Sequence, residues 1–182
     1  MFKKFNPAED VSASTQLKNS VQKGIKAKIC ESCPGAETVI DEIFPKKENF
    51  KIVKCKDHVE LVVGFTGEVL FIKHRDYPYF PHLHLLHKYP FLLPHQQVDK
   101  GAIKHVLNGS NIMCPGLTSP GAKMTEGVPK DAIVAIMAEG KVHALAVGSM
   151  KMSTEDVLKI NKDIGVDTIH YINDGVYRLT QI

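Results

Sequence analysis

Four side chains at two positions of the sequence have types and spacings that could bind a metal ion. Cys30 and Cys33 form a C-x2-C pair, Cys55 and His58 form a C-x2-H pair, and 21 residues separate the pairs. That arrangement is compatible with a Cys3His zinc site. The alternative is two buried thiols at the end of a helix and an unrelated surface histidine. Because Cys30 lies on or near an apolar helix stripe, we favour the alternative and expect no metal.

A second group with possible chemistry is the segment HLHLLHK, which contains His82, His84 and His87. In a helix, residues 84 and 87 share a face, as some metal-binding pairs do. The segment is short and rich in leucine, with proline and aromatic neighbours. We therefore interpret it as a short helix with Leu83, Leu86 and Tyr89 inward. Its histidines would form a polar rim at a domain junction, facing RNA or a partner.

The sequence contains no convincing catalytic set. The phosphate-binding pattern G-x-x-x-x-G-K-[ST], the nucleophile pattern G-x-S-x-G and the dinucleotide pattern G-x-G-x-x-G are all absent. No local signature arranges a cysteine and a histidine as nucleophile and base. We therefore expect a binding protein rather than an enzyme, and we expect no cofactor. A metal-dependent enzyme built on Cys30, Cys33, Cys55 and His58 is the open alternative.

Composition is that of an ordinary soluble protein. Hydrophobic residues make up 43% of the 182 residues and charged residues 24%, which is enough chain for one good domain or two small ones. No apolar run approaches a membrane helix, and MFKKFNPAED lacks the apolar core of a secretory signal, so we expect a cytoplasmic protein with thiols. The net charge of +3 is concentrated in residues 1–56, which carry eleven lysines and seven acids. That excess indicates either solvated helix faces or a phosphate-facing surface.

The first half has the pattern of helices followed by a small antiparallel sheet. Leu17, Val21, Ile25 and Ile29 recur every four residues, which predicts a helix over 14–32 with Ser14 as its N-cap. A short helix is expected over 37–43. Strands are expected over 50–54, 58–63 and 67–73, with Val59, Leu61 and Val63 on one face. Residues 76–81 have the composition of irregular chain, and Pro90 and Pro94 mark a domain boundary.

The second half restarts with a helix over 98–109, with Asp99 as N-cap and Gly109 as its end. A short strand over 111–114, a loop over 115–121, and two strands joined at Gly140 should follow. Ser153 should cap a short helix, and residues 169–179 have the pattern of a hairpin around Asn173-Asp174-Gly175.

The helix over 98–109 has two different faces. Ala102, Ile103, Val106 and Leu107 form one apolar arc, whereas Lys100 and Lys104 project from the other side. Gly101 lies in the first turn, where a phosphate or base could approach the backbone amides. Helix geometry alone does not exclude an ordinary amphipathic surface helix.

This segment resembles the PUA domain, an RNA-binding module named for pseudouridine synthases and archaeosine transglycosylases. The family pattern is a helix with Gly-Ala, a small-residue turn, a short strand and Pro-Gly. Here these are Gly101-Ala102, Gly109-Ser110, residues 111–114 and Pro115-Gly116, with Ser110 where many members have Ala. The resemblance implies an RNA-binding set, with the last two as weaker candidates: Lys100, Gly101, Ala102, Lys104, Pro115, Gly116, Lys123 and Lys151.

The resemblance extends over nearly the whole chain, through LLHKYPFLLPHQQVDKGAIK, NIMCPGLTSPGAK and IVAIMAEGK. It is to translation factors that have a pre-PUA domain before a PUA domain. It implies an α+β fold, in which a pre-PUA domain (1–92) packs on a PUA β-pseudobarrel with short helices (93–182). It also implies binding to small ribosomal subunit RNA, tRNA removal in recycling, and support of reinitiation or non-standard initiation. The implied partner is density-regulated protein, which carries a SUI domain; ligatin contains both parts in one chain.

Two further hypotheses concern the same surface. A targeting subunit of an RNA-modification complex is the alternative function, because PUA domains often accompany modification enzymes. Ser119, followed by Pro120, is a candidate for proline-directed phosphorylation. Its roughly two negative charges would lie beside the proposed RNA surface and should weaken contacts with phosphate.

Overall fold

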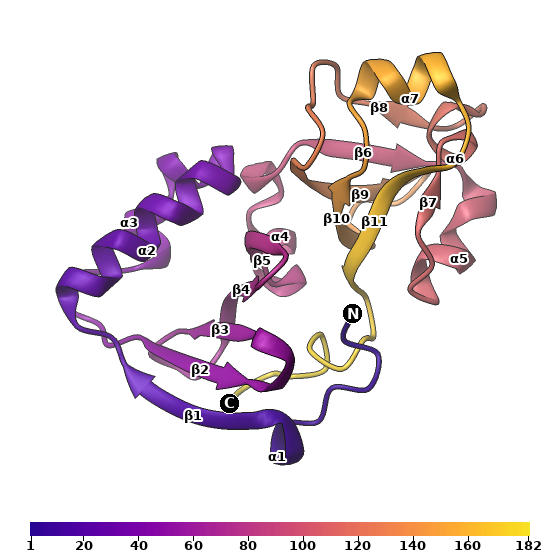
Figure 1. The fold of residues 1–182 in the computed structure, drawn as a ribbon. Helices are drawn as coiled ribbons and strands as arrows, with labels where there is room; N and C mark the ends of the chain where they lie inside the picture. Colours follow the sequence, from indigo (N-terminus) through magenta and orange to yellow (C-terminus); the bar gives the residue numbers. More distant parts are fainter.

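The computed structural model describes residues 1–182 and has two lobes, each built on an antiparallel or largely antiparallel sheet (Figure 1). The first sheet has the strand order β1-β2-β3-β4-β5, and the second has the order β7-β11-β10-β9-β6-β8. Within the second sheet only β6 and β9 are parallel, because β6 enters from the first lobe in the same direction as β9. None of the helices has the length and apolar character needed to cross a bilayer.

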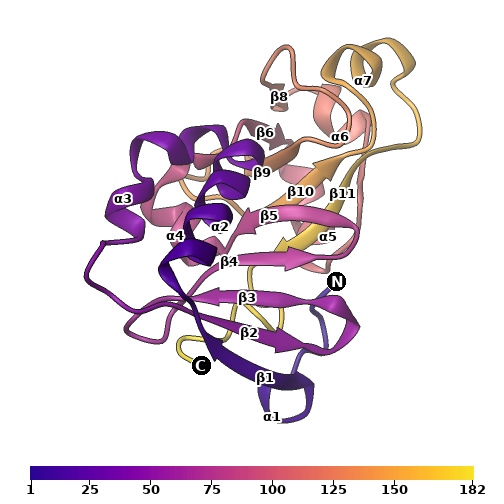
Figure 2. The same ribbon diagram turned by 60° about the vertical axis from the view of Figure 1, so that its left-hand side comes forward.

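The first lobe places helices over a five-stranded sheet, as Figure 2 shows from the side. Its strands are β1 (Val11–Gln16), β2 (Lys51–Cys55), β3 (Glu60–Val63), β4 (Val69–His74) and β5 (Tyr77–Pro81). Its helices are α1 (Pro7–Asp10), α2 (Asn19–Ser32), α3 (Ile40–Ile43) and α4 (Leu83–Lys88), with 3-10 turns at Pro34–Thr38, Lys56–His58 and Pro90–Leu92. Ile25 and Ile29 of α2 are buried, which explains the helical spacing of apolar residues in this segment.

The second lobe is a six-stranded curled sheet with short helices at its ends. Its strands are β6 (His95–Val98), β7 (Ile112–Met113), β8 (Lys123–Met124), β9 (Ile133–Ala138), β10 (Ala146–Met150) and β11 (Ile164–Tyr171). Its helices are a 3-10 turn at Lys100–Ala102, α5 (Ile103–Leu107), α6 (Pro115–Thr118) and α7 (Thr154–Ile160). The model therefore has the predicted α+β fold, with a small helix-covered sheet followed by a curled half-barrel.

The protein has two hydrophobic cores, and one of them contains residues from both lobes. The core of the second lobe contains 15 buried residues, among them Val134, Ile136 and Ala138 of β9. The other core has 33 buried residues and includes Ile133 and Ala135 from the opposite face of β9. Because alternate residues of one strand belong to different cores, the second sheet is covered on that face by the first lobe.

Several local predictions agree with the structure. Asp99 and Ser153 cap their helices by accepting hydrogen bonds from the backbone N–H groups of Ala102 and Asp156. Gly109 ends the α5 segment with φ of 82°, a left-handed conformation that favours glycine. The side chains predicted to point inward from α4 are buried: Leu83, Leu86 and Tyr89.

The predicted start of the long helix is wrong. The helix begins at Asn19 with Lys18 as N-cap, whereas Ser14 lies on β1 and pairs with Val53 of β2. β1 is an edge strand whose side chains are mostly exposed, so it has no alternating apolar pattern in the sequence. Pairing with β2 supplies backbone hydrogen bonds that local helix signals do not predict.

Strand predictions in the first lobe also need correction. The segment predicted to be irregular, 76–81, contains β5, which pairs with β4 despite two prolines. Val59, Leu61 and Val63, which were predicted to share a face, are buried, and Val62 is buried as well, so β3 is covered on both faces. The shared core explains the second result, because both faces of the sheet are packed.

Three predictions in the second half are also wrong in detail. The loop predicted after Cys114 contains α6, and β6 occupies the boundary region, where no strand was predicted. The predicted hairpin around Asn173 has only its first strand, β11. Beyond it the chain returns to the first lobe, where the N–H of Ile182 donates to the carbonyl of Gly67 at 2.9 Å. Figure 1 shows this tail beside β2 and β3.

Candidate nucleic-acid interface

Asp99 organises the region where the sequence predicts RNA contact. Its Oδ1 accepts a hydrogen bond from the N–H of Ala102 at 3.0 Å, and its Oδ2 accepts one from the hydroxyl of Ser119. The N–H of Asp99 in turn donates to the carbonyl of Gly116 at 3.3 Å. These bonds join the end of β6, the start of the α5 segment and the α6 region into one corner of the second lobe.

Most of the predicted RNA-binding residues meet at this corner. The backbone of Gly116 lies so close to Ala102 that a Cβ added to Gly116 would be 3.8 Å from the Cβ of Ala102. Lys100, Lys104 and Pro115 are exposed around this contact. Lys123 is also exposed and lies on β8, which pairs with β6 through Gln97. The tertiary structure therefore joins Ala102 and Gly116, two parts of the sequence motif that lie 14 residues apart.

Two of the first-turn amides, which the sequence interpretation proposed as contacts for a phosphate or base, already have carboxylate acceptors. The N–H of Lys100 donates to Oε2 of Glu139 at 3.3 Å, and that of Ala102 donates to Asp99. Two carboxylates therefore already occupy the position beside this short turn that a phosphate would need. Contact with phosphate at this corner would be made by the side chains of Lys100 and Lys104.

Lys151 lies apart from the other candidates. It follows β10 at the end where Ser149 pairs with Ile133, whereas Lys100 follows β6 at the end where Val98 pairs with Ala138. Five residues of strand separate the two ends, which is about 16 Å. Nζ of Lys151 is 3.2 Å from the Asp167 carboxylate, and this hydrogen bond raises the pKa of the Lys151 ammonium. Lys151 is thus committed to a surface ion pair.

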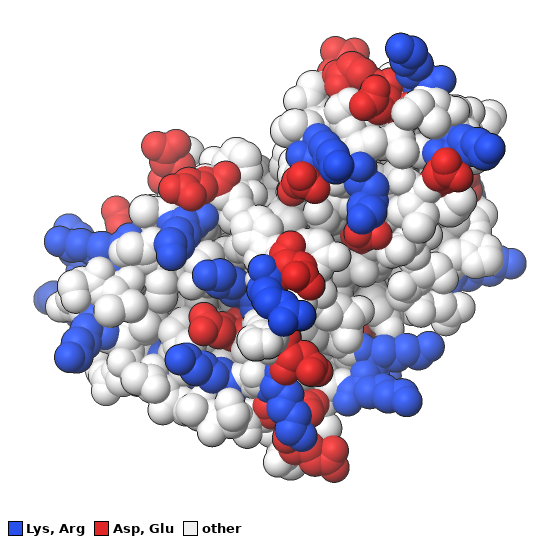
Figure 3. All heavy atoms as spheres, viewed as in Figure 1, with Lys and Arg blue, Asp and Glu red and all other residues white.

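Charges of both signs are interspersed over the face of the molecule seen in Figure 3. This face therefore has no large region of a single sign, in agreement with the small net charge of +3. An interface with RNA on this protein would have to be local, with a few lysines at defined positions.

The four side chains of the hypothetical zinc site do not come together. No three histidine, cysteine, aspartate or glutamate side chains lie in positions to share a metal ion. Cys33 is buried at the end of α2, and burial raises the pKa of its thiol to about 12. Burial likewise raises the pKa of Cys55 to about 11. Both thiols are therefore protonated at neutral pH, which opposes metal binding and nucleophilic chemistry.

The histidines of α4 contact the second lobe instead of forming a metal site. Nε2 of His87 is 2.8 Å from the carbonyl of Ala144, and Nε2 of His82 is 3.0 Å from the carbonyl of Val176. Nδ1 of His82 accepts a hydrogen bond from the N–H of His84, so Nε2 is the nitrogen that carries the proton. His82 is therefore a neutral, buried side chain, and burial lowers its pKa to about 3.

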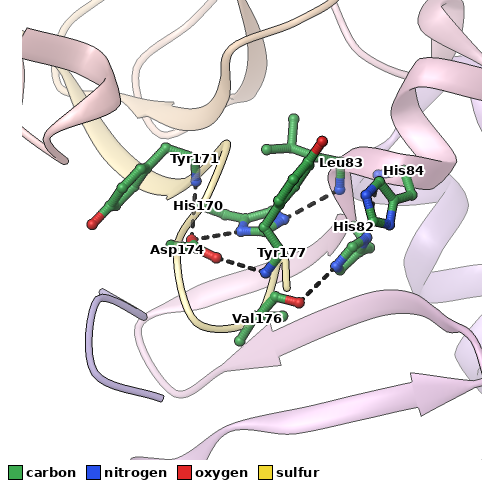
Figure 4. Close-up of polar contacts among 8 residues, drawn as sticks. All are labelled: His82, Leu83, His84, His170, Tyr171, Asp174, Val176 and Tyr177. Atoms are coloured by element: carbon green, nitrogen blue, oxygen red, sulfur yellow. Dashed lines mark hydrogen bonds and ion pairs between the residues drawn. The ribbon is translucent and has the colours of Figure 1, made fainter. Parts of the chain in front are cut away.

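A network of hydrogen bonds around the buried carboxylate of Asp174 lies beside His82 (Figure 4). It was not predicted from the sequence. Asp174 accepts hydrogen bonds from Nδ1 of His170 at 2.7 Å and from the backbone N–H groups of Tyr171 and Tyr177. Nε2 of His170 accepts a hydrogen bond from the N–H of Leu83 at 3.2 Å. This network connects β11 to the start of α4 and so fixes one lobe on the other. The spacing of His170 and Asp174 was its only local signal.

Comparison with protein families supports the two-domain interpretation. The pre-PUA-like domain matches residues 5–90, and the PUA domain matches residues 94–172. Malignant T-cell-amplified sequence 1-A of Xenopus laevis and malignant T-cell-amplified sequence 2 of Homo sapiens are each 58% identical to this chain. Each of these matches covers 98% of both proteins, and the Drosophila melanogaster homologue is 55% identical over 98% of this chain and 97% of its own length.

Solved structures show the same fold. A hypothetical protein from Pyrococcus horikoshii superposes with a TM-score of 0.75 at 23% identity, over 92% of this chain and 99% of that one. A PUA-domain protein from Thermoplasma acidophilum gives a TM-score of 0.67 at 19% identity, again over 92% and 99%. Sequence and fold together support an RNA-binding PUA protein. The chain belongs to the malignant T-cell-amplified sequence family, with a pre-PUA domain followed by a PUA domain.

Proposed function

We propose that the protein is a non-enzymatic RNA-binding translation factor that acts on the small ribosomal subunit. It supports reinitiation and non-standard initiation, and it removes tRNA during post-termination recycling. The observation that carries this proposal is the Ala102–Gly116 contact in a PUA domain, with Lys100 and Lys104 exposed on the same turn and helix and Lys123 exposed on β8. The curated relatives match over almost the full chain, which supports a role shared by both domains.

The mechanism is positioning rather than chemistry. Lysine side chains at the corner contact RNA phosphates. The hydrogen bonds that Asp99 accepts from Ala102 and Ser119 fix the backbone that carries these lysines. The pre-PUA domain, which we propose to end at residue 92, recruits or supports a partner that carries a SUI domain, density-regulated protein. The joint surface cradles or competes for the end of a tRNA in the cytoplasm.

The test is Lys100→Glu combined with Lys104→Glu, measured as affinity for purified small subunits over a series of salt concentrations. Both side chains are exposed, so the fold should be unaffected. The variant should bind more weakly, and the slope of log affinity against log salt should fall by about 1 for each lysine removed. Thermal melting of the variant reports whether it is folded.

The charge-matched control is Lys46→Glu with Lys47→Glu, in the exposed loop after α3. An equal loss in both double variants would show that net charge and not this corner determines binding. Unchanged affinity and salt slope in the Lys100 and Lys104 variant would refute the assignment. Copurification with an RNA-modification enzyme in place of small subunits would support the alternative function.

A further inference from the structure

A groove lies next to the lobe junction, on the face of the second sheet that carries Ala135 and Met137. It consists of two hollows, with volumes of about 430 and 90 Å³, that share His95 and Met137. Its floor is a row of paired strand residues, with Lys123 of β8 opposite Gln97 of β6 and Gln97 opposite Met137 of β9. The groove is therefore built on strands and has a defined shape.

The lining of the groove includes several apolar side chains among polar ones. Leu93 and Met124 join Met137 in the larger hollow, and Val142 lies at the edge of the smaller one. Val142 lies between β9 and β10 and is 83% exposed, the largest exposure of any large hydrophobic side chain in the protein. An exposed valine beside half-buried methionines is typical of a surface that packs against another molecule.

The charge of the groove indicates which kind of ligand it can bind. Its lining contains one side chain that is charged at neutral pH, Lys123, and contains no carboxylate. Lys141, next to Val142, is also exposed. A separate hollow of about 770 Å³ between the lobes differs from the groove, because its basic and acidic side chains are equal in number. They are Lys28, Lys73 and Lys130, and Glu31, Glu126 and Asp131. The groove, unlike this hollow, is thus complementary to an acidic occupant.

The lining also indicates a protein rather than a nucleic acid. It has no phenylalanine, tyrosine or tryptophan on which an unpaired base could stack. Methionine is enriched and carboxylates are depleted in the centres of protein interfaces. We propose that this groove binds a segment of a partner protein with apolar side chains flanked by carboxylates. The proposal rests on the proposed function, since the SUI-domain partner is the protein expected to supply that segment.

The experiment measures the dissociation constant of the full chain with full-length density-regulated protein by calorimetry. Val142→Asp places a carboxylate at the groove and should weaken binding about tenfold or more by losing apolar contact and repelling the acidic segment. Val142→Lys loses the same contact without the repulsion and should weaken binding less. Because Val142 is largely exposed, neither change should affect folding. Val21→Asp, at an exposed valine on α2, is the control and should bind like the unaltered chain.

The outcomes separate this proposal from the proposed function. Val142→Asp binding as tightly as the unaltered chain, or Val142→Lys binding as weakly as Val142→Asp, would overturn the acidic docking site. Loss of small-subunit affinity in Val142→Asp with unchanged partner affinity would assign the groove to RNA instead. If the unaltered chain failed to bind density-regulated protein, the partner in the proposed function would be wrong, whatever the groove variants showed.

Discussion

The most informative perturbation of this fold is Asp174→Asn, which changes one oxygen of a buried carboxylate into an amide nitrogen. Asp174 is 1% exposed, and its two oxygens accept three hydrogen bonds. One of these, from His170, belongs to the chain of bonds that connects β11 to α4. The hydrogen bonding of the lobe junction therefore depends on an acceptor that an amide supplies only once.

The expected loss of stability follows from the number of buried donors that lose their acceptor. His170 cannot move its proton to Nε2, because that nitrogen already accepts from Leu83. The amide oxygen of the variant should therefore stay towards Nδ1–H of His170 and the N–H of Tyr171, which leaves its NH2 group facing the N–H of Tyr177. One buried donor then lacks an acceptor, so the stability loss should be about 1–3 kcal/mol.

Thermal and urea denaturation at pH 7 would measure this loss. For a chain of this size 1 kcal/mol corresponds to about 2–4 °C, so the melting temperature should fall by at least about 2 °C. Asp76→Asn is the matched control, because Asp76 is 64% exposed and makes only surface ion pairs. A loss below about 0.5 kcal/mol for Asp174→Asn, or equal losses in both variants, would refute the reasoning.

Two further predictions concern acidification and the RNA corner. Because burial lowers the pKa of His82 to about 3, the unfolded chain takes up this proton first on acidification. Stability should therefore fall as pH drops from about 6.5 towards 3, by at most about 1.4 kcal/mol per pH unit from this group. Urea midpoints at several pH values would measure the fall, and a flat profile would contradict it. Ser119→Glu should cost about 1–2 kcal/mol of stability, since it sets a carboxylate against the Asp99 cap. Ser119→Ala removes one hydrogen bond and should cost about 1 kcal/mol, so equal urea midpoints for the two variants would argue against charge repulsion at the cap.

Predictions from the sequence succeeded where a local interaction decides the structure. Asp99 and Ser153 are N-caps because each side chain accepts from an amide three residues later, and Gly109 ends a helix because its backbone is left-handed. The apolar face of α4 is similarly local, since Leu83, Leu86 and Tyr89 follow a helical spacing. Such features need only a few neighbouring residues, so the sequence contains their full cause.

Predictions failed where a distant segment supplies the partner. Ser14 has the signature of a helix cap but lies on an edge strand, because β2 offers it a ladder of hydrogen bonds from about 40 residues away. Asp174 has the signature of a hairpin turn, and its donors lie within four residues, but distant segments pack against the turn: the N–H of Leu83 donates to His170, and the N–H of Gly175 donates to the carbonyl of Phe2. Neither outcome is visible in a local window.

For the candidate RNA surface, the residue types are evident from the sequence: two lysines on one helix face, a Gly-Ala pair and a Pro-Gly pair. Which of these residues lie together depends on the tertiary fold. The fold sets Gly116 against Ala102, places Lys123 on the adjacent strand, and places Lys151 at the opposite end of the sheet in an ion pair with Asp167. It also supplies carboxylate acceptors to two first-turn amides, those of Lys100 and Ala102. Helix faces follow from periodicity, whereas the proximity of separate segments depends on strand pairing and shared burial.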